Sequence, residues 1–251
     1  MVMASTAIVT GASQGIGRAC AMALLDAGWN TVLVSRSRDK LEQVIADSGC
    51  KNSAAMAAVC DVGDAAAVQS MFDEATERFG RVDLLFNNAG ISGPAGTIDE
   101  IPLDGWEQTV NINLKGMFNC ARSAFSLMKG QQPQGGRIIN NGSIAAHSPR
   151  PKTVPYTITK HAVTGLTKCL SLDGREYNIA CSQIDIGNVR TEMSIPMTKG
   201  MLQADGDRRP EPVFELSHVT DALMYMAALP LDVNVQFMTV MATGMPFIGR
   251  G

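Results

Sequence analysis

The chain has 251 residues, of which 45% are hydrophobic and 18% are charged, and its formal net charge at pH 7 is −3. This composition is ordinary for a globular protein and excludes disorder on a large scale. The small negative charge supplies no basic field that would attract nucleic acid. No uncharged apolar stretch reaches the roughly 18 residues that a membrane-spanning helix needs.

The N-terminal segment and the cysteines bear on where the protein works. Residues 1–10 lack the basic region and the long apolar region of a secretory signal peptide. The six cysteines are scattered without a Cys-x-x-Cys pair, and no histidine clusters with cysteines or carboxylates at the spacing of a metal site. We therefore expect a cytoplasmic protein with reduced thiols, no metal, and neither a membrane nor a nucleic acid as partner.

Short β-branched segments alternate with longer segments of helical periodicity along the whole chain. The expected strands cover residues 6–9, 31–34, 57–60, 82–86, 136–140, 179–184 and 236–240. The expected helices cover residues 16–27, a segment from about 39, and residues 65–79, 106–128, 156–177 and 216–228. Such alternation implies right-handed strand–helix–strand units and a doubly wound parallel sheet covered on both faces. We expect one α/β domain over residues 1–251.

One stretch departs from this regular alternation. Residues 188–214 are interrupted by prolines and glycines and show no long periodic pattern. A long irregular segment inside a compact domain is often a substrate lid. We expect residues 188–214 to form such a lid.

A glycine-rich turn joins the first expected strand to the first expected helix. Gly11, Gly15 and Gly17 permit a tight turn and let backbone amides approach a pyrophosphate at the positive end of the helix. This context favours dinucleotide binding over a turn needed only for packing. The expected binding residues in this turn are Gly11, Ser13, Gln14, Gly15, Ile16 and Gly17.

The ends of the second and third strands bear on the adenosine half of the dinucleotide. Arg36 follows the second strand, and no carboxylate precedes Asp39. An arginine there accommodates a 2′-phosphate, which favours NADP, with NAD still possible. The alternative is a solvated basic turn. Asp61, which follows the third strand with Val62, is placed to meet the adenine, or it caps the next helix.

Three residues of the second half have side chains suited to proton transfer. Tyr156 and Lys160 are four residues apart on an expected helix and therefore share one face. Ser143 follows a strand, at the sheet edge where the cofactor groups also end. A tyrosine–lysine pair alone also arises by chance on protein surfaces. The pair indicates a catalytic site only together with Ser143 at the same sheet edge.

With these motifs in order, the sequence resembles the short-chain dehydrogenase/reductase family over nearly its whole length. The matching segments are Thr10-Gly-Ala-Ser-Gln-Gly-Ile-Gly17, Asp61-Val62, Asn87-Asn-Ala-Gly90, Asn113, Ser143 and Tyr156-Thr-Ile-Thr-Lys160. The resemblance implies a Rossmann-like fold and a hydride transfer between a nicotinamide cofactor and an alcohol/carbonyl pair. It also implies a homodimer or homotetramer.

The resemblance also implies roles for individual residues. Tyr156 is expected to be the general acid/base, with Lys160 favouring its phenolate form and binding the nicotinamide ribose. Ser143 is expected to hold the substrate oxygen, and Asn113 to hold a water that links Lys160 to solvent. Tyr156 is also an expected cofactor contact, and the remaining ones are Asn87, Ala89, Gly90, Val189 and Thr191.

The chain departs from the family pattern after the sixth expected strand and at its C-terminus. The family usually has Pro-Gly where this chain has Ile186-Gly187, and Asp185 and Asn188 add polar groups nearby. Local turn hydrogen bonding is the expected role of these two residues. The Gly-rich closing strand typical of the family is absent, which puts a tetramer in doubt.

These observations predict an NADP-preferring oxidoreductase of a small or medium, mainly apolar carbonyl compound or its alcohol. Two alternatives remain open. A dinucleotide-binding sensor on the same scaffold would bind cofactor and turn nothing over. A reductase of acyl chains held on a carrier protein would need a basic patch, for which Arg150, Lys152, Lys199, Arg208 and Arg209 are candidates.

Overall fold

A seven-stranded parallel sheet forms the centre of the computed structural model, which describes residues 4–50 and 52–248. The strand order is β3-β2-β1-β4-β5-β6-β9, so the order reverses between β1 and β4. The bounds are β1 Thr6–Thr10, β2 Asn30–Ser35, β3 Ala55–Val59, β4 Leu84–Asn87, β5 Gly136–Asn141, β6 Ile179–Ile186 and β9 Phe237–Val240. The expected doubly wound sheet and single domain are confirmed.

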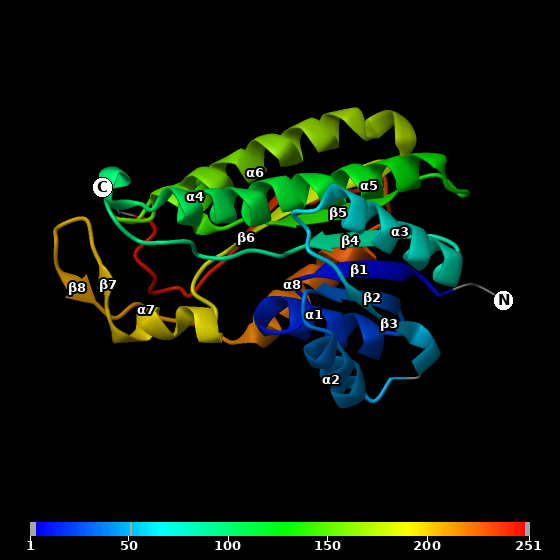
Figure 1. The fold of residues 1–251 in the computed structure, drawn as a ribbon, viewed down its shortest axis with the longest axis horizontal. Helices are drawn as coiled ribbons and strands as arrows, with labels where there is room; N and C mark the ends of the chain where they lie inside the picture. The colour runs from blue at the N-terminus through cyan, green and yellow to red at the C-terminus, as the bar shows by residue number, and fades with distance from the viewer. Residues whose placement is uncertain (1–3, 51, 249–251) are drawn as a thin grey trace.

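Helices cover both faces of the sheet (Figure 1). The helices on one face are α1 Gly15–Asp26, α2 Arg38–Ser48 and α8 Leu216–Ala228. Those on the other are α3 Ala65–Phe79, α4 Leu103–Val110, α5 Met117–Gly130 and α6 Val154–Asp173. Within the described residues, each helix is too short or too polar to traverse a lipid bilayer.

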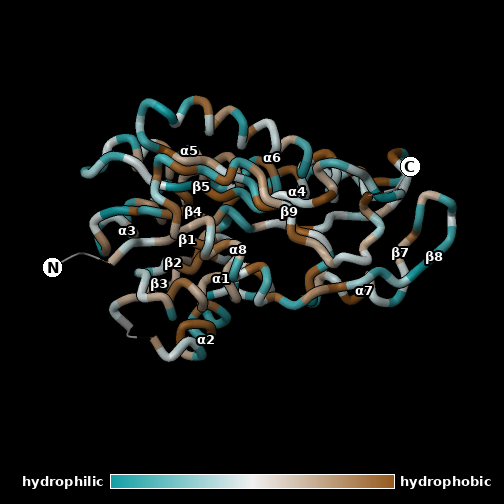
Figure 2. The backbone as a smooth tube through the Cα atoms, turned by 180° about the vertical axis from the view of Figure 1, so that it is seen from behind, coloured by the Kyte–Doolittle hydropathy of each residue, from teal (hydrophilic) through white to brown (hydrophobic). Residues whose placement is uncertain are grey.

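Each face of the sheet has its own hydrophobic core. On one face Val9 and Leu33 pack with Leu24 of α1. On the other face Ile8 packs with Phe72 of α3, because successive side chains of a strand point to opposite faces. In Figure 2 brown segments gather at the strands and at the helices packed on them, and teal segments occur mainly on the outside of the molecule. Both faces are buried, which explains the continuous apolar runs of the strands.

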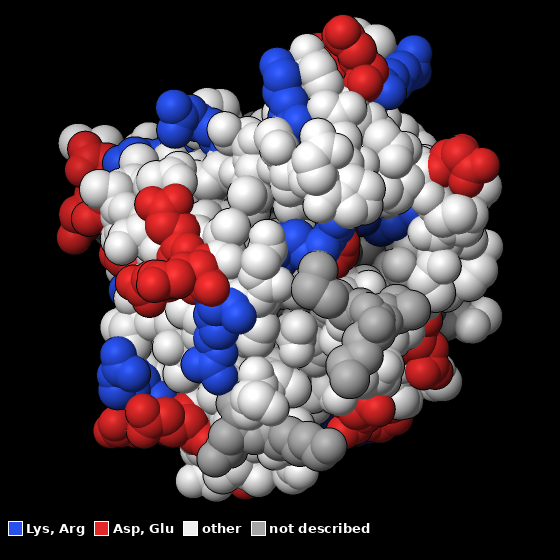
Figure 3. Space-filling model, turned by 90° about the vertical axis from the view of Figure 1, so that its right-hand side faces the viewer, with Lys and Arg blue, Asp and Glu red and all other residues white. Residues whose placement is uncertain are grey.

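The surface at the amino end of the strands carries charges of both signs. Figure 3 views the end of the molecule at which β1 begins, and Lys and Arg side chains are interspersed there with Asp and Glu. The sheet is thus surrounded by a mixed surface on the side opposite the carboxyl ends of its strands.

Two expected helices differ from the observed ones. The segment predicted at 106–128 begins earlier, at Leu103, and α4 and α5 are separated by a π-helical segment, Asn111–Gly116. A Cβ at Gly116 would lie 2.5 Å from Val62, so the glycine permits this close approach. The segment predicted at 156–177 ends at Asp173, because Gly174 packs against the backbone of Ile179.

The expected lid segment at 188–214 contains short elements. These are a turn at Glu192–Ser194, α7 Ile195–Lys199, β7 Met201–Leu202 and β8 Arg208–Arg209. The strands β7 and β8 form a small antiparallel hairpin that projects from the body beyond α7 (Figures 1 and 2). The segment lies on the side of the molecule toward which β1 runs.

Arg137, at the start of β5, lies in the interior of the protein although it is charged. Its side chain is 2% exposed and donates hydrogen bonds to the carbonyl oxygens of Leu229, Pro230 and Val233 and to Asn234 Oδ1, at 3.0–3.1 Å. Burial holds the pKa of Arg137 below its ordinary value. The guanidinium therefore ties the loop after α8 to the sheet.

We expect the native thiols to differ sharply in reactivity. Cys169 is exposed and Cys50 is partly buried, whereas the buried thiols are Cys20, Cys60, Cys120 and Cys181. Burial raises the pKa of Cys20 to about 12, and the thiolate is the reactive form. A disulfide reagent at mildly alkaline pH should label Cys169 quickly, Cys50 more slowly and the buried thiols only after unfolding. Peptide mass spectrometry measures the order, and rapid native labelling of Cys20 would contradict it.

Candidate active site

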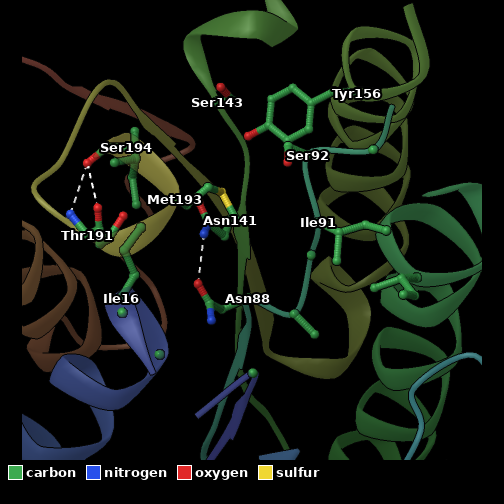
Figure 4. Close-up of a pocket in the computed structure, with 18 of the residues that line it drawn as sticks. Ile16, Asn88, Ile91, Ser92, Asn141, Ser143, Tyr156, Thr191, Met193 and Ser194 are labelled. Carbon is green, nitrogen blue, oxygen red and sulfur yellow. Dashed lines mark hydrogen bonds between the residues drawn. The ribbon is translucent and has the colours of Figure 1, made fainter. Parts of the chain in front are cut away.

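A cavity of about 680 Å³ lies at the carboxyl ends of β1, β2, β4, β5 and β6. In a doubly wound sheet, ligands bind at this edge, where the strand order reverses. The expected site residues that line the cavity are Gly11, Ser13, Gln14, Gly15, Ile16, Gly17, Arg36, Asp61, Val62, Ala89, Gly90, Ser143, Tyr156, Lys160, Val189 and Thr191. Figure 4 draws Tyr156 and Ser143 in the upper part of this pocket and Ile16, at the start of α1, in the lower part.

The glycine-rich turn holds the start of α1 close to the end of β1. Gly11 and Gly15 have φ values of +68° and +54°, a region that L-residues with side chains rarely adopt. A Cβ at Gly17 would overlap the carbonyl oxygen of Gly11. The side chain of the N-cap residue Gln14 does not bond the first amides of α1, and Gly15, Ile16 and Gly17 line the cavity. The turn therefore has the cradle and the free donors that a pyrophosphate requires.

The end of β2 presents basic and hydroxyl side chains to the cavity. Arg36 is exposed and lines the cavity, together with Ser35 and Ser37. Lys40 of α2 also lines it, a residue that the sequence analysis missed although it lies one helical turn after Arg36. The described residues of this part of the wall include no carboxylate.

The two aspartates after β3 have separate roles. Asp64 accepts hydrogen bonds from the amides of Ala66 and Ala67 at 2.8 and 3.2 Å and so caps α3. Asp61 accepts a hydrogen bond from the Gly63 amide within its own turn, at 2.9 Å, and lines the cavity. Asp61 was expected either to meet the adenine or to cap the next helix. The cap of α3 is Asp64, so the second of these roles is wrong.

Asn87 and Asn88, at the end of β4, point in different directions. Asn87 is not among the described residues that line the cavity: its side-chain amide is buried and donates to Met117 O at 2.8 Å and Asn140 Oδ1 at 3.2 Å. Its side chain thus braces the strands, and the expected cofactor contact does not follow from its position. Asn88 lines the cavity instead and accepts a 2.8 Å hydrogen bond from Asn141 (Figure 4).

Asn113 lies in the π-helical segment between α4 and α5. Its side chain is buried, with Oδ1 accepting from the Ile91 amide and Nδ2 donating to Ile91 O, both at 2.8 Å. Nδ2 also lies 3.3 Å from Thr159 Oγ1. The side chain is therefore occupied in holding residue 91, which lines the cavity, and Asn113 is itself not among the described lining residues. The expected contact of Asn113 with a water stays a prediction.

Ser143, Tyr156 and Lys160 meet at one end of the cavity. Ser143 follows β5, and the other two residues lie one turn apart on α6. Lys160 is 4% exposed, and its Nζ donates to Asn141 O at 2.7 Å and lies 5.5 Å from the centre of the Tyr156 ring. Figure 4 shows the Tyr156 hydroxyl directed into the pocket, with Ser143 and Ser92 around it. A phenol, a hydroxyl and an ammonium thus face one compartment.

The model of the family described as short chain dehydrogenase matches residues 5–201 of this chain. The match covers more than half of the sequence and includes both the glycine turn and the Ser143, Tyr156 and Lys160 cluster. This chain belongs to the short-chain dehydrogenases. Proteins of this family are NAD(P)-dependent oxidoreductases of hydroxyl and carbonyl groups, and this assignment of reaction class holds for the present chain.

Relatives of this short-chain dehydrogenase have diverse names. It is 31% identical over 242 residues to sulfoacetaldehyde reductase 2 of Chromohalobacter salexigens, covering 96% of this chain and 95% of that protein. It is 37% identical over 177 residues to a 3beta-hydroxysteroid dehydrogenase of Mediterraneibacter gnavus, covering 70% of this chain. That match spans 63% of the relative, which is less than two thirds of its length.

Solved structures of the same fold contain either form of the nicotinamide cofactor. The actinorhodin polyketide ketoreductase with NADPH has a TM-score of 0.83 and 25% identity, covering 95% of this chain and 96% of that one. A 3-ketoacyl-(acyl-carrier-protein) reductase from Brucella melitensis complexed with NADH has a TM-score of 0.82 and 24% identity, covering 96% and 98%. At 24% identity, the similarity to the Brucella melitensis structure shows only that the fold is shared.

The short-chain dehydrogenase carries an ion pair between the lid segment and the catalytic loop, the name used here for residues 142–153 between β5 and α6. Arg150 donates to Glu211 and also to Asn188 Oδ1, the latter at 2.9 Å, while Asn188 Nδ2 donates to Glu211 at 2.7 Å. Glu211 is buried, and Arg150 and Asn188 line the cavity. The expectation of purely local turn bonding at Asn188 is therefore wrong, because its partners are distant in sequence.

Proposed function

We propose that this short-chain dehydrogenase is an NADP-preferring enzyme that reduces a carbonyl compound, or oxidises the corresponding alcohol, with Tyr156 as general acid/base. The observation that carries this proposal is the convergence of Ser143, Tyr156 and Lys160 on a cavity that also contains the glycine turn. The cofactor, when bound, supplies or accepts the hydride. The fit of the cofactor is supported by the glycine cradle and the uncapped start of α1.

The side chains divide the remaining work among them. In the reducing direction Tyr156 Oη gives a proton to the substrate oxygen, and in the oxidising direction it takes one from the hydroxyl group. Ser143 Oγ accepts the Ala145 amide at 3.1 Å, which leaves its own hydrogen free to donate to the substrate oxygen. The buried Lys160 ammonium places positive charge beside the phenol and so favours the phenolate that forms. Asn141 O holds the ammonium in place.

The preference for NADP rests on the cavity wall at the end of β2. Arg36 and Lys40 both face the region in which the adenosine ribose would lie. Charge-assisted hydrogen bonds from an arginine to a phosphate are stronger than neutral ones. NAD remains usable because Ser35 and Ser37 can bond a hydroxyl group as well as a phosphate.

Arg36→Asp should reverse the cofactor preference. The substitution removes a cation from the 2′-phosphate and adds an acceptor for the 2′-hydroxyl, so the kcat/KM ratio of NADPH to NADH should fall by about tenfold or more. Steady-state kinetics with both reduced cofactors measure the ratio. Arg38→Asp is the matched control, since Arg38 faces Glu42 outside the cavity wall. A wild-type preference for NADH would contradict the assignment to Arg36.

The substrate compartment favours a small or medium carbonyl compound with an apolar part. Met193, Met197 and Met201 of the lid segment line the cavity, and flexible methionines adapt to varied apolar shapes. Residues 188–214 are accordingly proposed as the substrate lid, joined to the catalytic loop through Arg150 and Glu211. NADPH oxidation across a panel of carbonyl compounds, with alcohols and NADP⁺ in the reverse direction, tests the activity directly.

The same panel separates the alternatives. A sensor would bind NADPH and turn over none of the compounds, but the complete catalytic set favours an enzyme. A reductase of carrier-bound acyl chains would prefer the carrier-linked substrate over its free analogue. Three of the candidate cations for a carrier-binding patch are paired within the chain, which does not favour this alternative: Arg150 with Glu211, Lys152 with Glu100, and Arg209 with Asp205 and Asp207.

A homodimer or homotetramer is also proposed. Exposed apolar side chains on the outer surfaces of α5 and α6, such as Phe118, Ile158 and Leu172, support association through these helices. Native mass spectrometry measures the number of copies.

A further inference from the structure

Asp185, near the end of β6, is a fully buried carboxylate that the proposed reaction does not use. It is 0% exposed, and its Oδ1 accepts hydrogen bonds from the Ser143 amide at 2.9 Å and from Gln183 Nε2 at 2.7 Å. Its Oδ2 lies 2.7 Å from Nε2 of His147. This contact needs one hydrogen between the two atoms, and the His147 tautomer protonated at Nε2 supplies it. Local turn bonding was the expected role of Asp185. This expectation is wrong, because Asp185 contacts Ser143 and His147, which are distant in sequence.

The three partners of Asp185 include both ends of the turn that carries Ser143. Ser143 precedes the short 3-10 turn Ile144–Ala146, and His147 follows it. One carboxylate thus bonds the backbone at the start of the turn and the side chain at its end. His147 also makes an edge-to-face contact with Phe247, with the ring centroids 6.1 Å apart. The turn is clamped to β6 rather than held only by its own hydrogen bonds.

Gly142 gives the carboxylate access to the Ser143 amide. The Gly142 amide donates to Ile184 O at 2.9 Å, so this residue continues the pairing of β5 with β6. A Cβ at Gly142 would overlap Asp185 Oδ1. Gly142 does not have a positive φ, so other residues could adopt its backbone conformation. A glycine is needed here because a side chain would occupy the space of the Asp185 carboxylate.

Asp185 is in turn fixed by a chain of buried amides and hydroxyls. Gln183 Oε1 accepts from Thr167 Oγ1 at 3.2 Å, and Thr167 Oγ1 accepts from Asn140 Nδ2 at 3.0 Å. Asn140 Oδ1 accepts from Asn87, which links the chain to β4. Buried polar groups joined in this way have few alternative arrangements. The position of the carboxylate is therefore determined by three strands and α6.

We propose that Asp185 is a positioning residue for the reaction: it fixes the backbone of Ser143 and thereby the distance between the Ser143 hydroxyl and Tyr156. The inference rests on the proposed role of Ser143. Asp185 is not among the described residues that line the cavity, and its link to the site is the hydrogen bond from the Ser143 amide. What it supplies is a hydrogen-bond acceptor at that amide. A misplacement of about 1 Å at a reacting group can cost 10²-fold in rate, so a clamp of this kind has a large effect.

The test compares Asp185→Leu with Asp185→Asn. The leucine removes the acceptor, and kcat should fall by about 10²-fold, while the Kd of NADPH, measured by its fluorescence, stays at the wild-type value. The asparagine keeps an oxygen toward the Ser143 and Gln183 donors and turns its amide to His147, which can accept in its other neutral tautomer. Its kcat should therefore remain close to that of the wild type.

Ser182→Ala is the control on the same strand. Ser182 is fully buried and bonds Asn234 at 2.6 Å, so the substitution perturbs β6 away from Ser143, and kcat should not change. If Asp185→Leu does not fold, Gly142→Ala replaces it, because the added methyl group displaces the carboxylate from the Ser143 amide, and kcat should fall in the same way.

The outcomes separate this proposal from the proposed function. A wild-type kcat in Asp185→Leu or in Gly142→Ala would overturn the positioning role, and so would an Asp185→Asn enzyme as slow as the leucine variant. The proposed function is judged independently by Tyr156→Phe, since Tyr156 makes no contact with Asp185 among the described hydrogen bonds. Loss of activity in Tyr156→Phe together with full activity in Asp185→Leu would leave the function standing and remove only the clamp.

Discussion

Tyr156→Phe is expected to lower turnover by about 10²–10⁴-fold, the contribution of proton transfer by a placed side chain. The substitution removes one oxygen from the end of the cavity at which Ser143 and Lys160 also meet. The ring is retained, so the contact with the Lys160 ammonium and the packing of α6 should persist. Hydride transfer would then have to proceed without a proton donor or acceptor at the substrate oxygen. Steady-state kinetics in both directions measure the loss.

Two further measurements make this result specific. The Kd of NADPH should stay near the wild-type value, because the glycine turn and Arg36 are untouched. Tyr225→Phe removes the same atom from an exposed position on α8 and should leave kcat unchanged. Full turnover in Tyr156→Phe would refute the assignment of Tyr156 as the acid/base.

Arg137→Met should destabilise the protein by roughly 2–3 kcal/mol, since hydrogen bonds made by a charged group contribute about 1.5–3 kcal/mol. The guanidinium is the donor for three backbone carbonyl oxygens and for Asn234, and the methionine has none to offer. Total stabilities of folded domains are only about 5–15 kcal/mol, so the loss is a large share. Urea unfolding followed by circular dichroism gives the free energy of unfolding.

The matched control is Arg38→Met. Arg38 is exposed, and its contact with Glu42 at 3.8 Å is a surface ion pair worth at most about 1 kcal/mol. If both variants unfold at the same urea concentration as the wild type, the buried hydrogen bonds of Arg137 do not stabilise the sheet. A loss confined to Arg137→Met supports the anchoring of the loop after α8.

The parts of the fold that depend on local pattern could be predicted from sequence. The alternation of strand and helix segments predicted a parallel sheet covered on both faces, and the helices expected at 16–27 and 65–79 are followed by Gly28 and Gly80, whose φ values of 84° and 81° are left-handed. The spacing of Tyr156 and Lys160 placed them on one helix face, where the structure has them. These inferences need only the periodicity of helices and strands.

Features that depend on the exact register of neighbouring elements could not be predicted. Adjacent residues of a strand point to opposite sides, and the sequence does not say which of Asn87 and Asn88 points to the cavity. The contact of Asp185 with Ser143 requires the pairing of β5 with β6 and the missing side chain of Gly142. The lid segment has no period at all, so its hairpin and its link to Arg150 emerge only in three dimensions.

The π-helical segment Asn111–Gly116 sets the face that α5 presents to the core. A π-helical turn corresponds to one residue added to a regular α-helix, and each residue of an α-helix rotates the chain by about 100°. The wider turn absorbs the extra residue, so α5 keeps the phase in which Cys120, Ala124 and Met128 are buried. If the same residues wound as a regular α-helix, α5 would be rotated by about 100° and these side chains would leave the core. Deleting one residue of the segment would instead remove the bulge and leave the buried face of α5 as it is.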